Sequence, residues 1–155
     1  MVIEEVEMAD VFSREFRSEV MKRVRREGTL DEDMLAEALT NAGIVVGRND
    51  KTLPGSPDLV IKTCRLAVFV DGDFWHGRKW FEQALAPKTN REFWIKRFES
   101  NRERDRRVDR QLRQLGWAVT RVWGSDVRRD PRGVATRIKR RVKRLSRTIL
   151  LEGGE

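Results

Sequence analysis

The sequence contains a single cysteine, Cys64, a single histidine, His76, and no tyrosine among its 155 residues. One cysteine excludes a disulfide within the chain, and one cysteine with one histidine cannot assemble a zinc site of these ligands. No apolar run approaches membrane-spanning length, and the first ten residues, MVIEEVEMAD, are acidic where a secretion signal would be basic. These absences predict a soluble, cytoplasmic protein without structural zinc.

Positive charge is the strongest compositional signal. The chain has 33 Lys and Arg against 25 Asp and Glu, a formal net charge of +8 and a pI near 10.3. Such an excess favours a partner made of phosphates, and arginine, which predominates here, suits phosphate better than lysine does. The length indicates one domain, 1–155, in which residues 1–12 form a flexible tail.

The most informative stretch is LPGSPDLVIKTCRLAVFVDGDFWH, residues 53–76. Its prolines and glycine keep the first residues out of helix, so that Asp58 begins a strand over 59–61. A turn leads to a second apolar strand over 66–70, which ends in an Asp-Gly-Asp turn that begins at Asp71. If the two strands pair as a hairpin, Asp58 and Asp71 lie at one edge of the sheet and can share a divalent cation.

Each of these residues also has a structural interpretation. Aspartate is common in turns, and Asp-Gly after a strand is a frequent turn signal. His76 lies close enough to the carboxylates to act as a general base, although a lone histidine is more often a partly buried, hydrogen-bonded side chain. The convergence of two carboxylates and a histidine on one edge favours catalysis.

Amphipathic patterns predict two helices before this stretch, over 13–28 and 29–43, followed by a strand over 44–46. Thr29 and Glu32 have the spacing of a capping box at the start of the second helix. Glu32 therefore has a structural explanation, in which its carboxylate only folds back on the backbone.

After an irregular connection, a long helix is expected over 90–115 and a strand over 117–123. Asn101 and Asp105 interrupt the apolar stripe of the long helix. Because buried carboxylates are rarely unpaired, a polar cavity that also holds His76 would explain both residues.

The sequence ends in a helix that Asp130 caps and Pro131 opens. One stripe of this helix is apolar, and its other faces are almost entirely basic. We expect it to act as a sequence-independent clamp on phosphates through four arginines, namely Arg137, Arg140, Arg141 and Arg144.

The expected order of helix, helix, three strands, long helix, strand and helix suits a three-layer α/β/α domain with a mixed central sheet. A carboxylate that opens the second strand and another that ends the third match the restriction-endonuclease-like PD-(D/E)XK nucleases. Within that superfamily the sequence resembles the very short patch repair (Vsr-type) mismatch endonucleases over most of 13–125. The matching residues are Arg17-Ser18 with Met21, Glu32, Leu53-Pro54-Gly55 with Pro57-Asp58, Phe74-Trp75-His76, Glu92-Phe93-Trp94, Asn101 with Glu103-Arg104-Asp105, and Leu115-Gly116-Trp117 with Val122-Trp123.

The resemblance implies an endonuclease that nicks DNA on the 5′ side of the thymine in a T:G mismatch. It implies Mg²⁺ as the metal, for which Mn²⁺ can substitute, and His76 as the residue that activates water. The residues implied in catalysis are Glu32, Asp58, His76, Asn101 and Asp105. The metal ligands are Asp58, the main-chain carbonyl of Val70 and, as the favoured of two interpretations, Asp71.

The same resemblance implies how DNA is contacted. Phe74, Trp75 and Trp94 match aromatic side chains that wedge into the base stack from the major groove, and Met21 matches an apolar residue that reaches the minor groove. Wedging costs least where a base pair is already mismatched, so the wedge itself selects mismatches. The expected partner is double-stranded DNA, bound by a monomer, with mismatch-repair proteins as further candidates.

The sequence departs from the family at a structural zinc. The Cys and His ligands of that zinc are replaced by Asp73, Arg78, Trp80 and Ser125. Either apolar packing by Trp80 and its neighbour Phe81 takes its place, or the loop after the histidine is mobile.

Two other functions fit the same residues. A non-catalytic DNA-binding module would explain the charge, but not why Asp58, Asp71 and His76 gather at one edge. A structure-specific or sequence-specific endonuclease of the same fold, acting on non-mismatched DNA, would use the same chemistry. Nicking assays on different DNA substrates distinguish these possibilities.

Overall fold

A mixed sheet lies at the centre of the computed structural model, which describes residues 14–153. The strands follow the order β1-β2-β3-β4. β2 pairs antiparallel with both β1 and β3, so the predicted hairpin is confirmed, and β3 and β4 are parallel. The bounds are Gly47–Arg48 for β1, Leu59–Ile61 for β2, Leu66–Asp71 for β3 and Ala118–Trp123 for β4.

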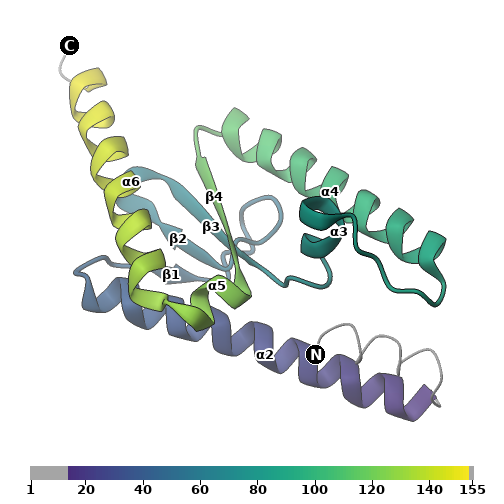
Figure 1. The fold of residues 1–155 in the computed structure, drawn as a ribbon. Helices are drawn as coiled ribbons and strands as arrows, with labels where there is room; N and C mark the ends of the chain where they lie inside the picture. Colours follow the sequence, from purple (N-terminus) through teal and green to yellow (C-terminus); the bar gives the residue numbers. More distant parts are fainter. Residues whose placement is uncertain (1–13, 154–155) are drawn as a thin grey trace.

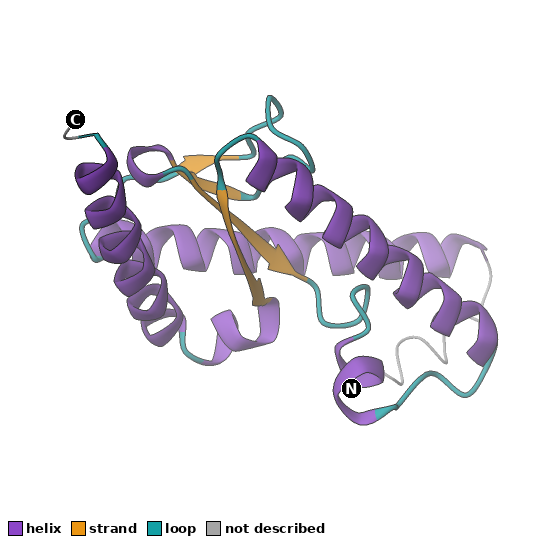
Figure 2. Ribbon diagram, turned by 90° about the horizontal axis from the view of Figure 1, so that it is seen from above, coloured by secondary structure: helices purple, strands orange, loops and turns teal. Residues whose placement is uncertain are grey.

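Helices cover both faces of this sheet (Figure 1). Alternate residues of β3 point to opposite faces: Val68 packs with Leu35 of α2 on one face, and Phe69 packs with Leu112 of α4 on the other. Seen from above, α4 and α2 lie on opposite sides of the strands (Figure 2), which confirms the three-layer fold. The helices are α2 (Arg14–Asn41), α3 (Arg78–Gln83), α4 (Arg91–Gln114), α5 (Gly124–Arg129) and α6 (Pro131–Glu152).

The prediction of two helices over 13–28 and 29–43 is wrong, because α2 continues through both segments. The hydroxyl of Thr29 donates to the carbonyl oxygen of Arg25 at 3.1 Å, as an interior helical threonine does, and so does not begin a new helix. A glycine inside a helix costs only about 1 kcal/mol. The packing of the C-terminal half of α2 in the core favours continuity over a break at Gly28.

Other boundaries also differ from the prediction. The strand expected over 44–46 is absent there, although Ile44 is buried and Val45 is 85% exposed. Pairing with β2 begins only at Gly47, the first residue of β1. The segments that contain α3 and α5 were expected to be irregular. The long helix and the C-terminal helix are confirmed, and the Asp130 carboxylate accepts the predicted capping hydrogen bond from the backbone N–H of Gly133 at 2.9 Å.

The parallel pairing of β3 and β4 determines where functional groups gather. Asp71 pairs with Trp123, so both strands end at the same edge of the sheet. The loop 72–77 leaves β3 at this edge, and α5 begins directly after β4. Residues from these four segments can therefore meet here. Within the described chain, no helix is both long and apolar enough to span a membrane.

Candidate active site

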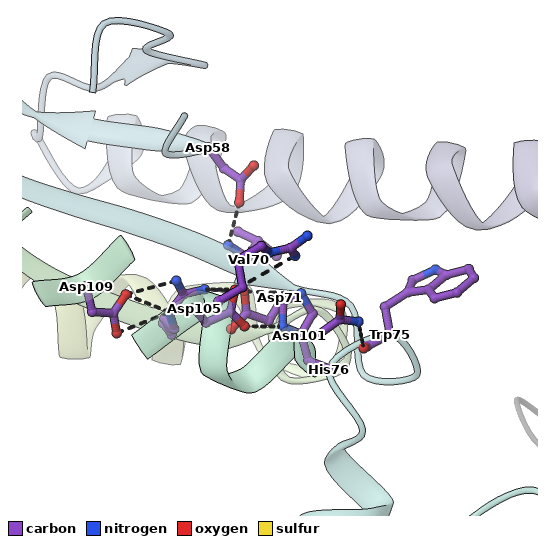
Figure 3. Close-up of polar contacts among 10 residues, drawn as sticks. Asp58, Val70, Asp71, Trp75, His76, Asn101, Asp105 and Asp109 are labelled. Carbon is purple, nitrogen blue, oxygen red and sulfur yellow. Dashed lines mark hydrogen bonds and ion pairs between the residues drawn. The ribbon is translucent and has the colours of Figure 1, made fainter. Parts of the chain in front are cut away.

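Asp58 lies at this edge of the sheet, immediately before β2. Its Oδ2 accepts a hydrogen bond of 2.7 Å from the backbone N–H of Val70, so the carboxylate is held against the end of the neighbouring strand (Figure 3). Burial raises the pKa of Asp58, and the hydrogen bond from Val70 opposes that rise. As the hairpin predicts, the start of β2 lies beside the end of β3. Asp58 contacts the backbone of Val70 there, whereas Asp71, the expected neighbour, is engaged by Arg121.

Glu32 of α2 shares a hydrogen bond with Asp58. Burial and repulsion from the Asp58 carboxylate raise the pKa of Glu32 from its ordinary value of 4.5 to about 7. Because α2 is continuous, Glu32 does not close a capping box with Thr29. The interpretation of Glu32 as a capping residue is therefore wrong. Its carboxyl group lies beside that of Asp58.

His76 lies between two other carboxylates. Its Nδ1 is 2.7 Å from Oδ2 of Asp105, and its Nε2 is 3.7 Å from Oδ1 of Asp71. Burial acts to raise the pKa of Asp105, but the hydrogen bond and the charge of His76 outweigh burial, so this pKa is lowered. Because an ionised carboxylate only accepts hydrogen bonds, Asp105 holds the proton on Nδ1, and in the neutral imidazole the lone pair then lies on Nε2.

The predicted polar cavity is present. A cavity of about 420 Å³ is lined by residues that include Asp71, His76 and Asp105. Asn101, one turn before Asp105 on α4, has a different role from the one expected, because its amide donates to the carbonyl oxygen of Trp75 at 2.8 Å. Asn101 therefore holds the backbone of the residue before His76. Its amide bonds this backbone and not the imidazole.

Arg121 of β4 is the site residue that sequence reasoning missed. Its Nη1 is 3.0 Å from Oδ1 of Asp71 and 3.7 Å from Oδ1 of Asp105, and its Nη2 is 2.9 Å from Oδ1 of Asp109. The register pairs Arg121 with Phe69, which places both on the α4 face of the sheet. A charged residue in the middle of an otherwise apolar strand was the available signal, since such a residue needs a buried partner.

The predicted wedge residues form one aromatic cluster beside the site. Phe74 packs edge-on against Trp75 and Trp94, with ring centroids 5.3 Å and 5.0 Å away. All three side chains are half-buried, as expected for residues that are not ordinary core. The Trp75 indole points away from His76 (Figure 3). The indole nitrogen of Trp94 is buried without a hydrogen-bond partner among the described residues, which is costly for a packing residue.

Of the four arginines predicted to clamp phosphates on α6, only some are available to bind DNA. Three of them are exposed, but Arg141 is half-buried and donates to the hydroxyl of Thr120 at 2.7 Å. Burial, followed by repulsion from Arg144 and Arg113, lowers the pKa of Arg141. Arg141 therefore belongs to the packing between α6 and β4. The side chain of Met21, the fourth predicted DNA contact of the site region, lies outside the described residues.

Oxygen-rich groups could hold a metal ion in two places. Asp71, His76 and Asp105 each offer a ligand atom within 4.8 Å of the others, but Arg121 already compensates the charge of these acids. Asp58 and Glu32 bring two carboxyl groups together on the other side, where burial and, after it, repulsion from Asp58 raise the pKa of Glu32. Carboxylates and a main-chain carbonyl are the hard oxygen ligands that suit Mg²⁺.

Comparisons with known proteins agree with this geometry. A family profile described as DNA mismatch endonuclease Vsr matches residues 9–82. The type II nicking enzyme V.HpaIIP of Haemophilus parainfluenzae is 36% identical over 134 residues, which cover 86% of this chain and 95% of the relative. The type II nicking enzyme V.NmeDIP of Neisseria meningitidis serogroup C is 37% identical, with 86% and 90% covered. The DNA mismatch endonuclease Vsr of Escherichia coli K12 is 39% identical over 116 residues, with 75% and 74% covered.

Proposed function

Because the chain belongs to the family of Vsr-type DNA mismatch endonucleases, and is a DNA endonuclease, we propose that it nicks duplex DNA 5′ to the thymine of a T:G mismatch. We propose Mg²⁺ as its metal. The observation that carries this proposal is the connection between two parts of the site. His76, with its proton fixed by Asp105, follows Trp75 directly, so one short loop carries both the base and the wedge.

The metal would be held by Asp58 and the main-chain carbonyl of Val70, with Glu32 beside them. The hydrogen bond between Asp58 and the N–H of Val70 supports this assignment, because it holds the carboxylate at the end of β3. A bound Mg²⁺ would stabilise the negative charge that develops on the scissile phosphate. Asp71 remains a candidate ligand, although its Oδ1 is engaged by Arg121.

His76 is proposed to take the proton from the attacking water. Its Nε2 carries the lone pair and, at 3.7 Å from Asp71, is beyond hydrogen-bond distance of that carboxylate. The imidazole is therefore oriented on one side by Asp105 and able to accept a proton on the other. A water that lies between Nε2 and the phosphate would be deprotonated as it attacks.

The aromatic cluster is proposed to select the substrate. Inserting Phe74, Trp75 and Trp94 into duplex DNA separates stacked bases, at a cost on the order of a few kcal/mol per step. A mismatched step is already weakened, so insertion is easiest there. The half-buried state of all three residues supports this role, since the fold alone would bury large aromatic rings more completely.

Nicking assays on matched substrates test the proposal. Labelled duplexes that differ only at one base pair, as T:G, another mismatch or a Watson–Crick pair, would be compared with a branched duplex in Mg²⁺, in Mn²⁺ and in EDTA. We expect metal-dependent nicking that is fastest for T:G and falls on the 5′ side of the thymine. Equal rates on matched or branched DNA would instead support an endonuclease for non-mismatched sites.

Trp75→Ala tests the wedge separately. We expect this variant to keep its thermal stability but to lose far more activity on the T:G duplex than on a site that is already unpaired. Trp117→Ala is the matched control, because Trp117 packs against the core cluster of Phe69 and Leu112. This control should unfold at lower temperature and leave the ratio of the two activities unchanged.

A further inference from the structure

Three of the four positions at which the resemblance implies a structural zinc form a different kind of site in this chain. Zinc is bound by Cys, His, Asp and Glu, and of the four residues only Asp73 is of these types. Another of the four, Arg78, carries a positive charge that would repel the ion. The donor set therefore does not fit zinc.

Asp73, Arg78 and Ser125 instead bind one another, together with Asp126. Nη1 of Arg78 lies 3.3 Å from Oδ2 of Asp73, 3.0 Å from Oγ of Ser125 and 3.0 Å from Oδ1 of Asp126. Ser125 donates its backbone N–H to Oδ1 of Asp73 at 3.0 Å and its hydroxyl to Oδ2 of the same carboxylate. Nε of Arg78 also reaches Glu82 at 3.1 Å. We call Asp73, Arg78, Ser125 and Asp126 the arginine clip.

The arginine clip joins three parts of the chain. Asp73 belongs to the loop after β3, Arg78 begins α3, and Ser125 and Asp126 lie in the first turn of α5. The guanidinium also lies 5.2 Å from the centroid of the Trp123 ring, at the end of β4. A zinc ion with ligands at the same positions would connect the same segments.

The clip holds the loop that carries the proposed base and wedge. Asp73 and Arg78 lie at its two ends, and the N–H of Arg78 donates to the carbonyl oxygen of Asp73 at 2.9 Å, which closes the loop. His76 lies between these two anchored residues. At Gly77, φ is +63°, and an added Cβ would lie 2.6 Å from the Phe98 ring, so the loop also has little room to rearrange.

We propose that the arginine clip takes the place of the structural zinc, and that Arg78 is a positioning residue that orients His76 and Trp75 for nicking. The low exposure of its members supports this role. Only 23% of the Arg78 side chain is exposed, against 21% for Asp73 and 16% for Asp126. Ion pairs that are largely shielded from water hold their geometry better than surface pairs do. The part that concerns nicking rests on the proposed function.

Arg78→Met tests this role, because methionine keeps much of the side-chain length but removes the charge and the donors. A displacement of about 1 Å in a catalytic group can cost on the order of a hundredfold in rate. We therefore expect kcat for T:G nicking to fall by roughly tenfold to a hundredfold, with little change in KM. Arg78→Lys should recover part of the loss, and added guanidinium ion should partly rescue Arg78→Met.

Arg129→Met is the matched control. Arg129 contacts the same Oδ1 of Asp126, at 3.0 Å, but from the surface, where 78% of its side chain is exposed. This variant should nick at the wild-type rate. If both variants lost activity equally, or if Arg78→Met nicked normally, Arg78 would not position the loop.

Two further measurements do not depend on activity. Amide hydrogen exchange over 72–77 should be faster in Arg78→Met than in the wild type, with exchange in the core of β3 unchanged. Elemental analysis of the purified protein should find no stoichiometric zinc, and one zinc per chain would overturn the proposal. If exchange is faster in Arg78→Met but the wild type nicks no DNA, the proposed function is refuted, whereas the structural role of the arginine clip stands.

Discussion

The carboxylates on the two sides of β3 form two groups that differ in how their charge is balanced. On the α4 side, Asp71, Asp105 and Asp109 surround Arg121, whose guanidinium lies within 3.0 Å of Asp71 and 2.9 Å of Asp109. On the α2 side, Glu32 and Asp58 share a hydrogen bond and crowd each other. Arg121 offsets part of the negative charge of the first group, whereas the crowded carboxyl groups of the second would gain from a cation.

The pKa directions differ within the α4 side, where burial raises the pKa of Asp71 although His76 and Arg121 act to lower it. His76 and Arg121 help to lower the pKa of Asp105, although its burial acts in the opposite sense. Burial and Asp58 raise the pKa of Glu32 to about 7. We infer a division of labour, in which the α4 side fixes the orientation of the base and the α2 side binds the metal.

The largest expected effect is that of Asp58→Ala. Because a metal contributes several kcal/mol to charge stabilisation, losing the proposed main ligand should reduce nicking by roughly three orders of magnitude or more, with duplex binding retained. Asp33→Ala is the matched control, since this exposed acid of α2 binds only Arg48 in the hydrogen bonds found. Full activity of Asp58→Ala in EDTA would reject a metal-dependent mechanism.

His76→Ala should have the next largest effect, lowering the rate by roughly two to four orders of magnitude, as is usual for the loss of a general base. Asp105→Asn should cost less, because it misorients the imidazole without removing it. Single-turnover nicking of a T:G duplex measures both. If His76→Ala nicks at the wild-type rate, another group activates the water and the division between the two sides is wrong.

Glu32→Gln should reveal the charge imbalance as a dependence of stability on pH. The folded protein keeps the Glu32 proton up to about pH 7, whereas the unfolded chain loses it near 4.5, so the penalty for burying this acid grows as the pH rises between these values. Above pH 7 without metal, Glu32→Gln should be more stable than the wild type by about 1 kcal/mol, after allowance for solvent screening. The melting temperature should then rise by about 2–4 °C.

At pH 4 this difference should vanish, since Glu32 is protonated in both the folded and the unfolded chain. Thermal unfolding at the two pH values measures it, and equal melting temperatures above pH 7 would contradict the proposed repulsion. The same variant should nick more slowly, because a glutamine cannot supply a negative charge near the metal.

The smallest effect per residue is expected on α6, far from both groups. Replacing the exposed arginines Arg137, Arg140 and Arg144 by glutamine should weaken all duplexes alike and reduce the salt dependence of binding by about one unit per lost phosphate contact. Arg141→Gln should instead lower thermal stability, because it removes the contact with Thr120. A loss confined to one DNA sequence would mean that this helix reads bases.

The sequence is sufficient to predict the elements whose patterns are local. The apolar strands around Asp58 and the interrupted stripe of α4 lead to the hairpin and to the contact between Asp105 and His76, because strand pairing and helical periodicity dictate which residues face one another. Arg121 could not be placed in the same way. Its partners lie on β3 and α4, and they are recognised only once the parallel pairing of β3 and β4 is known.

The break predicted in α2 failed for a related reason. Gly28 and Thr29 are signals of local propensity, and packing against the sheet overrides them. The clip was missed because an arginine beside an aspartate reads as an ordinary surface pair until Ser125 and Asp126, 47 and 48 residues away, are brought alongside.

Because α2 is continuous, it fixes the distance and the rotation between residues along its length. Glu32 and Met21 are separated by eleven residues, which corresponds to about 16 Å along the axis. The rotation between these two positions about the helix axis is fixed as well, since no break in the helix separates them. One alanine inserted beside Gly28 would turn everything before it by about 100° relative to the sheet. The direction in which the N-terminal half of α2 projects from the sheet is thus set by residue count, and a single added residue would change it.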